Sequence, residues 1–310
     1  MDIKILISQM TMLFLILALG YVIFKARLVD EGFSKTFSNL ILKVTMPAMV
    51  LSSVLDLTER QELKDVLMAL GVATAMFFIV LPLLGLLLAK IFRVRKNSTG
   101  LYVFMNTFSN VGFMGFPVIE ALAGSVGLFY AAIYNLVFNI AVFTLGVWLV
   151  NRDKGNDAKF DLKLLLTPGV IVAFLALILY FVNIKPPALI CNALRMVGSI
   201  TSPAAMLVIG FTLARMDIKS VFSHWRIYPW TIAKQLIIPL ILWVPFSAIV
   251  KNEILLTVTF ILFAMPVANN AVLFANTYDG DSKLAARSVF ITTLFALITV
   301  PLCVWLVQFY

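Results

Sequence analysis

Long apolar runs, separated by short charged connections, recur along the whole of this 310-residue sequence. A run of about 20 apolar residues crosses the hydrocarbon core of a bilayer as a helix, because each residue adds about 1.5 Å along the helix axis. The composition agrees, since 62% of the residues are hydrophobic, 13% are charged and the mean hydropathy is +1.03. The interior of a water-soluble protein cannot enclose that much apolar surface. The sequence therefore predicts an all-α polytopic membrane protein.

We predict ten transmembrane helices from the positions of these runs. The first is followed, rather than preceded, by the cations Lys25 and Arg27, which indicates a retained helix and not a cleaved signal peptide. The most polar connection, residues 151–167, divides the chain into a first unit, 1–150, and a second unit, 168–310. The predicted spans are 5–24, 38–55, 66–91, 99–122, 127–150, 168–182, 189–213, 228–250, 254–278 and 284–307.

Lysine and arginine are concentrated in alternate connections, those that follow the odd-numbered spans. Cytoplasmic connections of membrane proteins carry an excess of these residues. The connection 151–167 is therefore predicted to be cytoplasmic, and both termini are predicted to lie outside the cytoplasm, in the plasma (inner) membrane. The net charge of +9 is interpreted as this orientation signal, so we expect no nucleic-acid partner. The opposite face has only Lys4, Arg60, Lys64, Lys185 and Lys251.

The two units resemble each other when the chain is shifted against itself by 156 or 157 positions. Several matches at one shift indicate a duplication. Because each unit has five spans, an odd number, the second copy lies upside down relative to the first, as an inverted-topology repeat. An alternative is that the matches reflect only the frequency of proline in membrane helices. The shift aligns Pro47 with Pro203, Pro82 with Pro239, Gly112 with Asn269, and the two VWLV sequences that end at Val150 and Val307.

Two predicted spans, one in each unit, are interrupted by glycine, proline and polar residues. They are residues 106–120 (NTFSNVGFMGFPVIE) and 265–281 (MPVANNAVLFANTYDGD). In hydrocarbon such interruptions are tolerated where they are buried in protein or line a wet cavity, and in transporters they mark the binding site. We expect half-helices to begin at Val118 and at Ala271. Their free amides carry partial positive charge and favour a carboxylate.

Uncharged polar side chains at the interruptions are the candidate ligands. Asn110, Asn269 and Asn270 have amide donors, although each alternatively only satisfies the broken backbone. Asn135 and Asn139 share a helix face, for which we favour interhelical hydrogen bonding over a place in the same cavity. The other candidates are Thr107, Ser109, Gly112, Gly115 and Pro117.

Charged residues are rare within the predicted spans. Lys43, Arg195 and Lys234 either extend toward the nearest membrane surface or create a positive field for an anion. Among the fifteen acidic residues only Glu120 and Asp279 fall near a span, which argues against a simple cation exchanger. These five charged residues are candidates for ion coupling or for shaping the electrostatic field.

Nothing in the sequence indicates an enzyme or a cofactor. It contains no pairing of nucleophile and base, no phosphate-binding glycine loop and no metal-ligand spacing. Cys191 and Cys303 fall inside apolar spans, and His224, the single histidine, falls in a connection. We predict no catalytic residues, no metal and no cofactor.

Taken together, these motifs resemble a bacterial member of the auxin efflux carrier family, which includes plant auxin exporters and bacterial malonate and malate permeases. The similarity covers nearly the whole chain. It lies in MPAMV at 46–50, in Asn110, Gly112, Gly115 and Pro117, in Met265 and Pro266 with the asparagines that follow, and in residues 277–301.

The resemblance implies ten helices in a five-plus-five inverted repeat, with crossing discontinuous helices 4 and 9 beside a carboxylate site. It implies that Asn110 is the carboxylate-binding asparagine and that Pro117 is the crossover proline. The second interruption departs from the plant pattern, because Ala271 stands where those carriers have a further proline.

The function expected is secondary active transport of small organic anions by alternating access. Mono- or dicarboxylates such as malate or malonate, or auxin-like acids, are the expected substrates, and a homodimer is left open. One alternative is a sodium-coupled organic anion symporter of the bile-acid carrier type, in which side-chain and backbone oxygens hold the sodium. A second is a non-transporting membrane sensor, which would have little reason to keep two interrupted polar helices.

Overall fold

The structure is a computed structural model that describes residues 3–55, 57, 61–152, 168–182, 186–216, 222, 224–278 and 280–307. Within these residues the secondary structure is helical, with one isolated β-bridge and no strand. The first half contains α1 (Ile3–Lys25), α2 (Glu31–Leu40), η1 (Ile41–Thr45), α3 (Met46–Leu55), α4 (Leu63–Ala75), η2 (Met76–Val80), α5 (Leu81–Ile91), η3 (Lys96–Ser98), α6 (Thr99–Thr107), η4 (Val111–Gly115), α7 (Phe116–Ala141), η5 (Val142–Gly146) and α8 (Val147–Arg152). The second half contains α9 (Pro168–Val182), α10 (Ala188–Gly198), α11 (Thr201–Ala214), α13 (Ile227–Ile232), η7 (Ala233–Ile237), α14 (Ile238–Ile249), α15 (Glu253–Ala264), α16 (Asn270–Thr277) and α17 (Ser282–Val307).

Seven helical stretches of the described residues are long and apolar enough to cross a membrane. Two further apolar helices are shorter, at 170–182 and 253–264. The all-helical prediction is confirmed, whereas the division into ten spans stays a prediction. Beyond Arg152, the central connection lies outside the described residues. The seven stretches are Ile7–Lys25, Glu31–Leu55, Leu63–Ile91, Val111–Arg152, Ala188–Ala214, Ile227–Ile249 and Ser282–Val307.

The longest stretch, Val111–Arg152, is divided by Gly124. A straight helix of its 42 residues would be about 63 Å long, roughly twice the thickness of the hydrocarbon core. Gly124 has φ +56° and ψ −151°, a backbone conformation that glycine adopts without the steric cost that other residues meet. The stretch therefore consists of two helices that meet at Gly124.

A widened π-helical turn precedes four of the prolines in the described helices. Proline has no N–H to donate and clashes with the carbonyl four residues before it, and a π turn relieves this conflict without ending the helix. The turns η1, η2, η4 and η7 each end two residues before a proline, at Pro47, Pro82, Pro117 and Pro239. The helices therefore continue past these four prolines.

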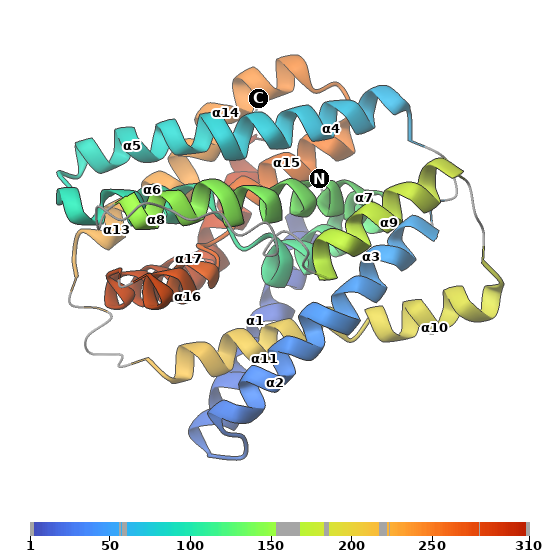
Figure 1. Ribbon diagram of the computed structural model, residues 1–310, viewed down its shortest axis with the longest axis horizontal. Helices are drawn as coiled ribbons and strands as arrows, with labels where there is room; N and C mark the ends of the chain where they lie inside the picture. The colour runs from blue at the N-terminus through green and yellow to red at the C-terminus, as the bar shows by residue number, and fades with distance from the viewer. Residues whose placement is uncertain are drawn as a thin grey trace.

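Several helices run side by side, and α1 crosses them. Figure 1 shows the α4–α5 rod with part of α14 toward one long edge and α2–α3 with α10 and α11 toward the opposite edge, with α6, α7 and α8 between them. Helix α1 packs against α11, α5 against α6, and α3 against both α9 and α10. Large apolar side chains point outward from several helices, including Leu15, Leu189 and Ile241. Such an apolar exterior suits a lipid environment.

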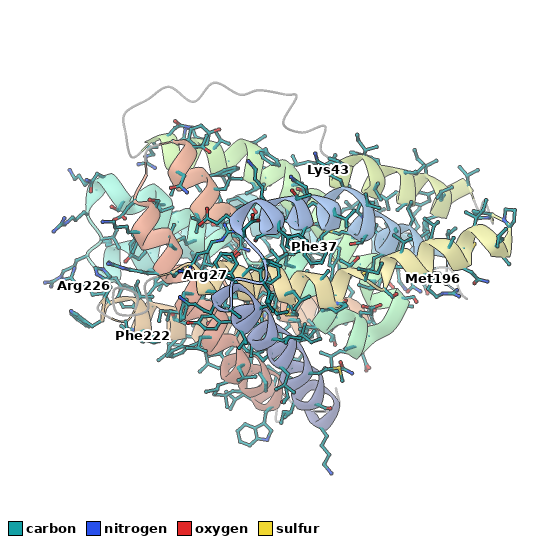
Figure 2. The ribbon with its side chains drawn as sticks, turned by 90° about the horizontal axis from the view of Figure 1, so that it is seen from below. Arg27, Phe37, Lys43, Met196, Phe222 and Arg226 are labelled. Atoms are coloured by element: carbon teal, nitrogen blue, oxygen red, sulfur yellow. The ribbon has the colours of Figure 1, made fainter. Side chains whose placement is uncertain are left out.

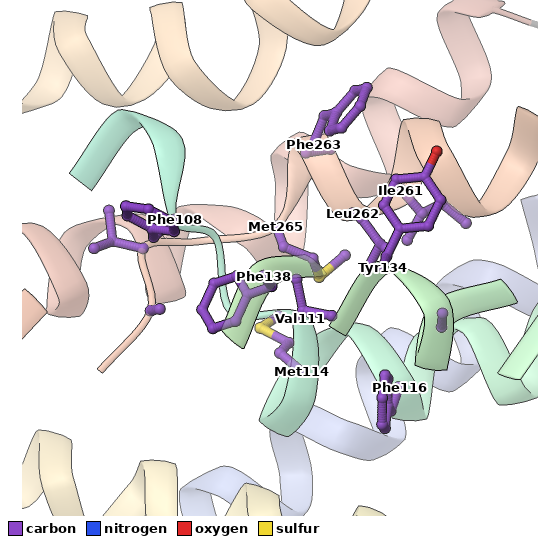
Figure 3. Close-up of a cluster of buried hydrophobic side chains, with 14 of the residues drawn as sticks. Phe108, Val111, Met114, Phe116, Tyr134, Phe138, Ile261, Leu262, Phe263 and Met265 are labelled. Atoms are coloured by element: carbon purple, nitrogen blue, oxygen red, sulfur yellow. The ribbon is translucent and has the colours of Figure 1, made fainter. Parts of the chain in front are cut away.

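The core includes side chains from both halves of the chain. Figure 3 shows Val111, Met114 and Phe138 of the first half close to Met265 of the second. The rings of Phe108 and Phe138 meet edge to face, with centroids 5.6 Å apart. The two halves are therefore joined through a common core at the interrupted segments.

Candidate functional site

The two interrupted segments pair with each other through their backbones. Helix α6 ends at Thr107 and the chain becomes helical again at Val111, while α15 ends at Ala264 and α16 begins at Asn270. Between these ends, Ser109 and Val267 form an antiparallel β-bridge.

Two hydrogen bonds join the segments at this bridge. The amide of Asn110 donates to the carbonyl of Pro266 at 2.7 Å, and the amide of Ala268 donates to the carbonyl of Phe108 at 3.0 Å. Each segment thus satisfies backbone groups of the other, which hydrocarbon requires.

The first interruption lies earlier in the chain than the sequence prediction placed it. We expected a break over Gly112–Pro117 and a half-helix from Val118, but the helix resumes at Val111. Asparagine is a strong N-cap, and Asn110 Oδ1 accepts a hydrogen bond from the amide of Phe113 at 3.1 Å. The π turn η4 then accommodates Pro117 inside the helix. The second half-helix, expected from Ala271, begins one residue earlier.

A cavity of about 270 Å³ lies beside the paired segments. Its wall contains six asparagines from several parts of the chain, together with apolar side chains such as Met46, Phe138 and Phe143. Lys43 is the one charged residue among the described residues that line it, and none of them is an aspartate or a glutamate. The asparagines are Asn39, Asn110, Asn135, Asn139, Asn269 and Asn270.

Several of these amides keep free hydrogen-bonding groups at the cavity. With Asn110 Oδ1 occupied by the cap, the Nδ2 group of Asn110 makes no hydrogen bond to any described residue. The side chains of Asn269 and Asn270 are likewise without a partner among the residues described. The cavity therefore offers amide donors, rather than carboxylates, to a bound molecule.

The two lysines of the site occupy different environments. Lys43 lies in η1, is exposed and lines the cavity, and Figure 2 labels it on the α2–α3 rod. Lys234 lies in η7, is only 2% exposed and is not among the lining residues. Its Nζ donates to Ser109 Oγ at 2.9 Å and to the carbonyl of Met265 at 3.0 Å. For Lys234 the interpretation as a side chain that extends to the membrane surface is therefore wrong.

Of the remaining residues predicted at the interruptions, two line the cavity and three lie behind it. Ser109 and Gly112 are part of the wall. Thr107 is fully buried and donates to the carbonyl of Val103 within its own helix, so it does not reach the cavity. Gly115 and Pro117 are buried and do not line the cavity either.

Gly115 permits a close approach between the two halves. A Cβ atom at this position would stand 2.8 Å from Leu262 Cδ2 of α15, closer than real Cβ contacts. Glycine here lets η4 pack directly against α15. Gly115 therefore shapes the packing around the paired segments and does not contact the contents of the cavity.

The charged residues predicted near the span ends do not line the cavity. Glu120 is exposed and accepts a hydrogen bond from Ser202 Oγ at 3.0 Å. Arg195 is exposed and donates to Asn192 Oδ1 at 3.0 Å. Asp279 lies outside the described residues.

The sequence reasoning missed Asn39 and favoured a different role for two other asparagines. Asn39 precedes Lys43 by four positions, so the two share a helix face, and that spacing was the available signal. Asn135 and Asn139 were expected to bond between helices. Instead Asn139 Nδ2 donates to the carbonyl of Asn135 at 2.6 Å within one helix, and both residues line the cavity.

The sequence is similar to those of known membrane transport proteins. The sequence matches the family described as membrane transport protein over residues 5–304. It is 26% identical over 285 residues to an uncharacterized transporter of Methanocaldococcus jannaschii, covering 90% of this chain and 91% of that one. It is 25% identical over 311 residues to the uncharacterized transporter YfdV of Escherichia coli K12, covering 96% of each. The mouse lysosomal cholesterol signaling protein is 23% identical over 315 residues, which are 94% of this chain and 36% of that protein.

Proposed function

Because the chain belongs to the membrane transport protein family, the family of the auxin efflux carriers, we propose that it is a secondary active transporter of small organic anions. The expected resemblance is thereby confirmed at the level of the family. The relatives from M. jannaschii and E. coli are described as transporters, and the apolar helices make this a multi-pass membrane protein. The more specific likeness to malonate and malate permeases stays a prediction, as does the absence of enzymatic activity.

The observation that carries the proposal is the chemistry of the cavity wall. Six asparagines and Lys43 surround about 270 Å³, and no acidic side chain is among the described lining residues. Amide and ammonium groups donate hydrogen bonds to a carboxylate, and the ammonium supplies the opposite charge. A wall without carboxylates favours an anion over a cation.

The helix ends at the cavity carry partial charge of the same sign as Lys43. The helix that starts at Val111 and helix α16 both begin beside the cavity, where Asn110 and Asn269 line its wall. The N-terminal end of a helix carries a partial positive charge from its free amides. Both ends would therefore stabilise a carboxylate bound between them, which is the site that we propose.

The proposal includes the predicted ten-span architecture. If Val111–Arg152 is divided at Gly124, and α9 and the interrupted pair α15 and α16 are each counted as a span, the seven long stretches become ten. The combination of a π turn and a proline in η2 with Pro82 recurs 157 positions later in η7 with Pro239. This recurrence supports two inverted units, 1–150 and 168–310. The charge of the connections supports extracytoplasmic termini, and the plasma membrane is part of the proposal.

The pairing of the interrupted segments supports alternating access. Because backbone hydrogen bonds join residues 108–110 to residues 266–268, we expect the two segments to move together. We propose that the bundle containing them moves against a scaffold made of spans one, two, six and seven, so that the cavity faces each side of the membrane in turn.

Counterflow in proteoliposomes tests this function. Proteoliposomes that contain the purified protein are loaded with unlabelled malate, malonate or a larger aromatic acid. Uptake of the same labelled acid is then followed in potassium buffer and in sodium buffer. Saturable counterflow of a carboxylate, absent from liposomes that contain the Asn110→Asp variant, is the expected result. No counterflow of any carboxylate in either buffer would refute the proposal, and counterflow only in sodium would establish the sodium-coupled alternative.

A sensor is the second candidate, and the mouse relative is the observation that favours it. That protein is named for cholesterol signaling, and its similarity covers nearly the whole of this chain. Saturable binding of a ligand to the purified protein, without movement of that ligand in proteoliposomes, would favour a sensor over a transporter.

A further inference from the structure

The buried ammonium of Lys234 lies at the paired segments but outside the cavity wall. It donates to a hydroxyl of the first segment, Ser109 Oγ, and to a backbone carbonyl of the second, that of Met265. One side chain thus bonds to both interruptions. Ser109, in turn, lines the cavity, so Ser109 links Lys234 to the cavity wall.

Lys234 adjoins the C-terminal end of helix α15. Met265, whose carbonyl accepts from Lys234 Nζ, directly follows the last residue of α15, whereas Ser109 lies two positions after the end of α6 and two positions before the helix that starts at Val111. The C-terminal end of a helix carries partial negative charge, and a cation beside it is stabilised. The ammonium thus adjoins a C-terminal helix end, while the N-terminal ends at Val111 and at α16 adjoin the cavity.

The partners of this ammonium are oxygens without a formal charge. Among the described residues, no aspartate or glutamate oxygen lies within 4.0 Å of Lys234 Nζ. Desolvating a charge at membrane depth is costly, so an ionisable side chain kept there without a carboxylate partner points to a function. In transporters with interrupted helices, unwound carbonyls and C-terminal helix ends are the groups that bind a coupling cation. Lys234 Nζ lies at such a group, the carbonyl of Met265 at the end of α15.

We propose that Lys234 is a positioning residue whose tethered ammonium stands in for a coupling cation at the paired segments. The proposal rests on the proposed function, since it concerns the cation requirement of that transporter. With the cation supplied by the chain itself, transport of the organic anion needs no sodium. Removing the ammonium leaves Ser109 Oγ and the Met265 carbonyl free to bind a small cation from solution.

A second brace keeps the segments in place when Lys234 is changed. Gln235 Nε2 donates to the carbonyl of Thr292 at 3.0 Å, and the hydroxyl of Thr292 accepts from the amide of Val267 at 3.1 Å. Helix α17 therefore holds the second segment independently of Lys234. We expect variants at Lys234 to fold.

The experiment compares three variants with the wild-type protein in buffers whose monovalent cation is sodium, ammonium or N-methylglucamine. Lys234→Ala removes the ammonium and opens its space, whereas Lys234→Met removes the charge but fills the space. Lys90→Ala, which changes an exposed lysine at the end of α5, is the control. Counterflow of the carboxylate and the melting temperature (Tm) in detergent are measured for each.

Wild type and Lys90→Ala are expected to transport within about twofold in all three buffers. In N-methylglucamine, Lys234→Ala is expected to lose roughly tenfold or more of its rate, the change that corresponds to one lost hydrogen bond of a charged group. Sodium or ammonium restores part of that rate and raises the Tm of Lys234→Ala by about 2 °C or more, because a cation bound to the native state stabilises it. Lys234→Met is slow in every buffer, and its Tm does not respond.

Three results would overturn the proposal. They are a sodium requirement of the wild type, wild-type transport by Lys234→Ala in N-methylglucamine, and an equal loss by Lys234→Ala in every cation without any Tm response. The Tm measurement needs no substrate. If no carboxylate is transported by the wild type while Lys234→Ala gains a cation-dependent Tm, the proposed substrate class fails and the assignment of Lys234 stands.

Discussion

Replacing Asn110 by alanine removes two interactions whose effects can be measured separately. Its Oδ1 caps the helix at the amide of Phe113, and its Nδ2 faces the cavity. Loss of the cap lowers the free energy of unfolding by about 1 kcal/mol. Loss of a hydrogen bond to a charged carboxylate costs about 1.5–3 kcal/mol, which raises the Kd about 10- to 150-fold. Equilibrium binding of a transported carboxylate and the Tm of purified Asn110→Ala measure the two effects.

Asn110→Asp is the matched variant, because it keeps an oxygen that accepts from the Phe113 amide. Its stability is expected to stay close to that of the wild type. It also places a negative charge beside the bound carboxylate, and two like charges about 4 Å apart repel by about 4 kcal/mol at an effective dielectric constant of 20. Anion affinity should therefore fall further in Asn110→Asp than in Asn110→Ala. Equal or tighter binding by Asn110→Asp would refute an anion site at Asn110.

Two further predictions concern Lys43 and Gly115. Because Lys43 is exposed, Lys43→Ala should raise the Kd for the anion only about 2- to 5-fold and weaken the dependence of the Kd on salt. Lys43→Arg should retain the affinity and the salt dependence of the wild type. Binding measured across a salt series checks this, and an unchanged salt dependence in Lys43→Ala would contradict it. Gly115→Ala should lower the free energy of unfolding by about 1 kcal/mol or less, because its Cβ would stand 2.8 Å from Leu262 Cδ2, the end of a side chain that can shift. Gly71→Ala, in α4 with no atom within 4 Å of the added Cβ, is the control and should be neutral or stabilising by up to about 1 kcal/mol. Equal Tm values for the two glycine variants would contradict the expected stability cost of the contact at Gly115.

The sequence located the second interruption better than the first, for a local reason. Around Pro266 the proline and the paired asparagines mark the same place, and helix α16 begins within one residue of the expected start. Around Pro117 the signals compete. The glycines and the proline suggested a break, but the cap from Asn110 and the π turn η4 keep the helix continuous past Pro117. Whether the helix breaks or continues there depends on hydrogen bonds that composition does not reveal.

The site was predicted in part, because residue type is visible in a sequence and helix rotation is not. Asn110, Asn269 and Asn270 line the cavity, as expected from polar residues at interruptions. Asn39 was missed because it lies within a regular helix, where only its orientation brings it to the wall. Lys234 was recognised as unusual, but its two partners come from segments 125 and 31 residues away in the chain. Such long-range contacts are set by tertiary packing.

The pairing of the interrupted segments also has a consequence for biosynthesis. The carbonyl of Phe108 receives its hydrogen bond from Ala268, which is made 160 residues later. At a synthesis rate of about 5–20 residues per second, this group waits roughly 8–32 s for its partner. During that interval the first segment has inserted with its unwound backbone unsatisfied, so the first half cannot reach its final structure on the ribosome. We expect residues 1–150 expressed alone to be more sensitive to protease than the same residues made in one cell with residues 151–310; equal resistance of the first half alone would contradict this order of assembly.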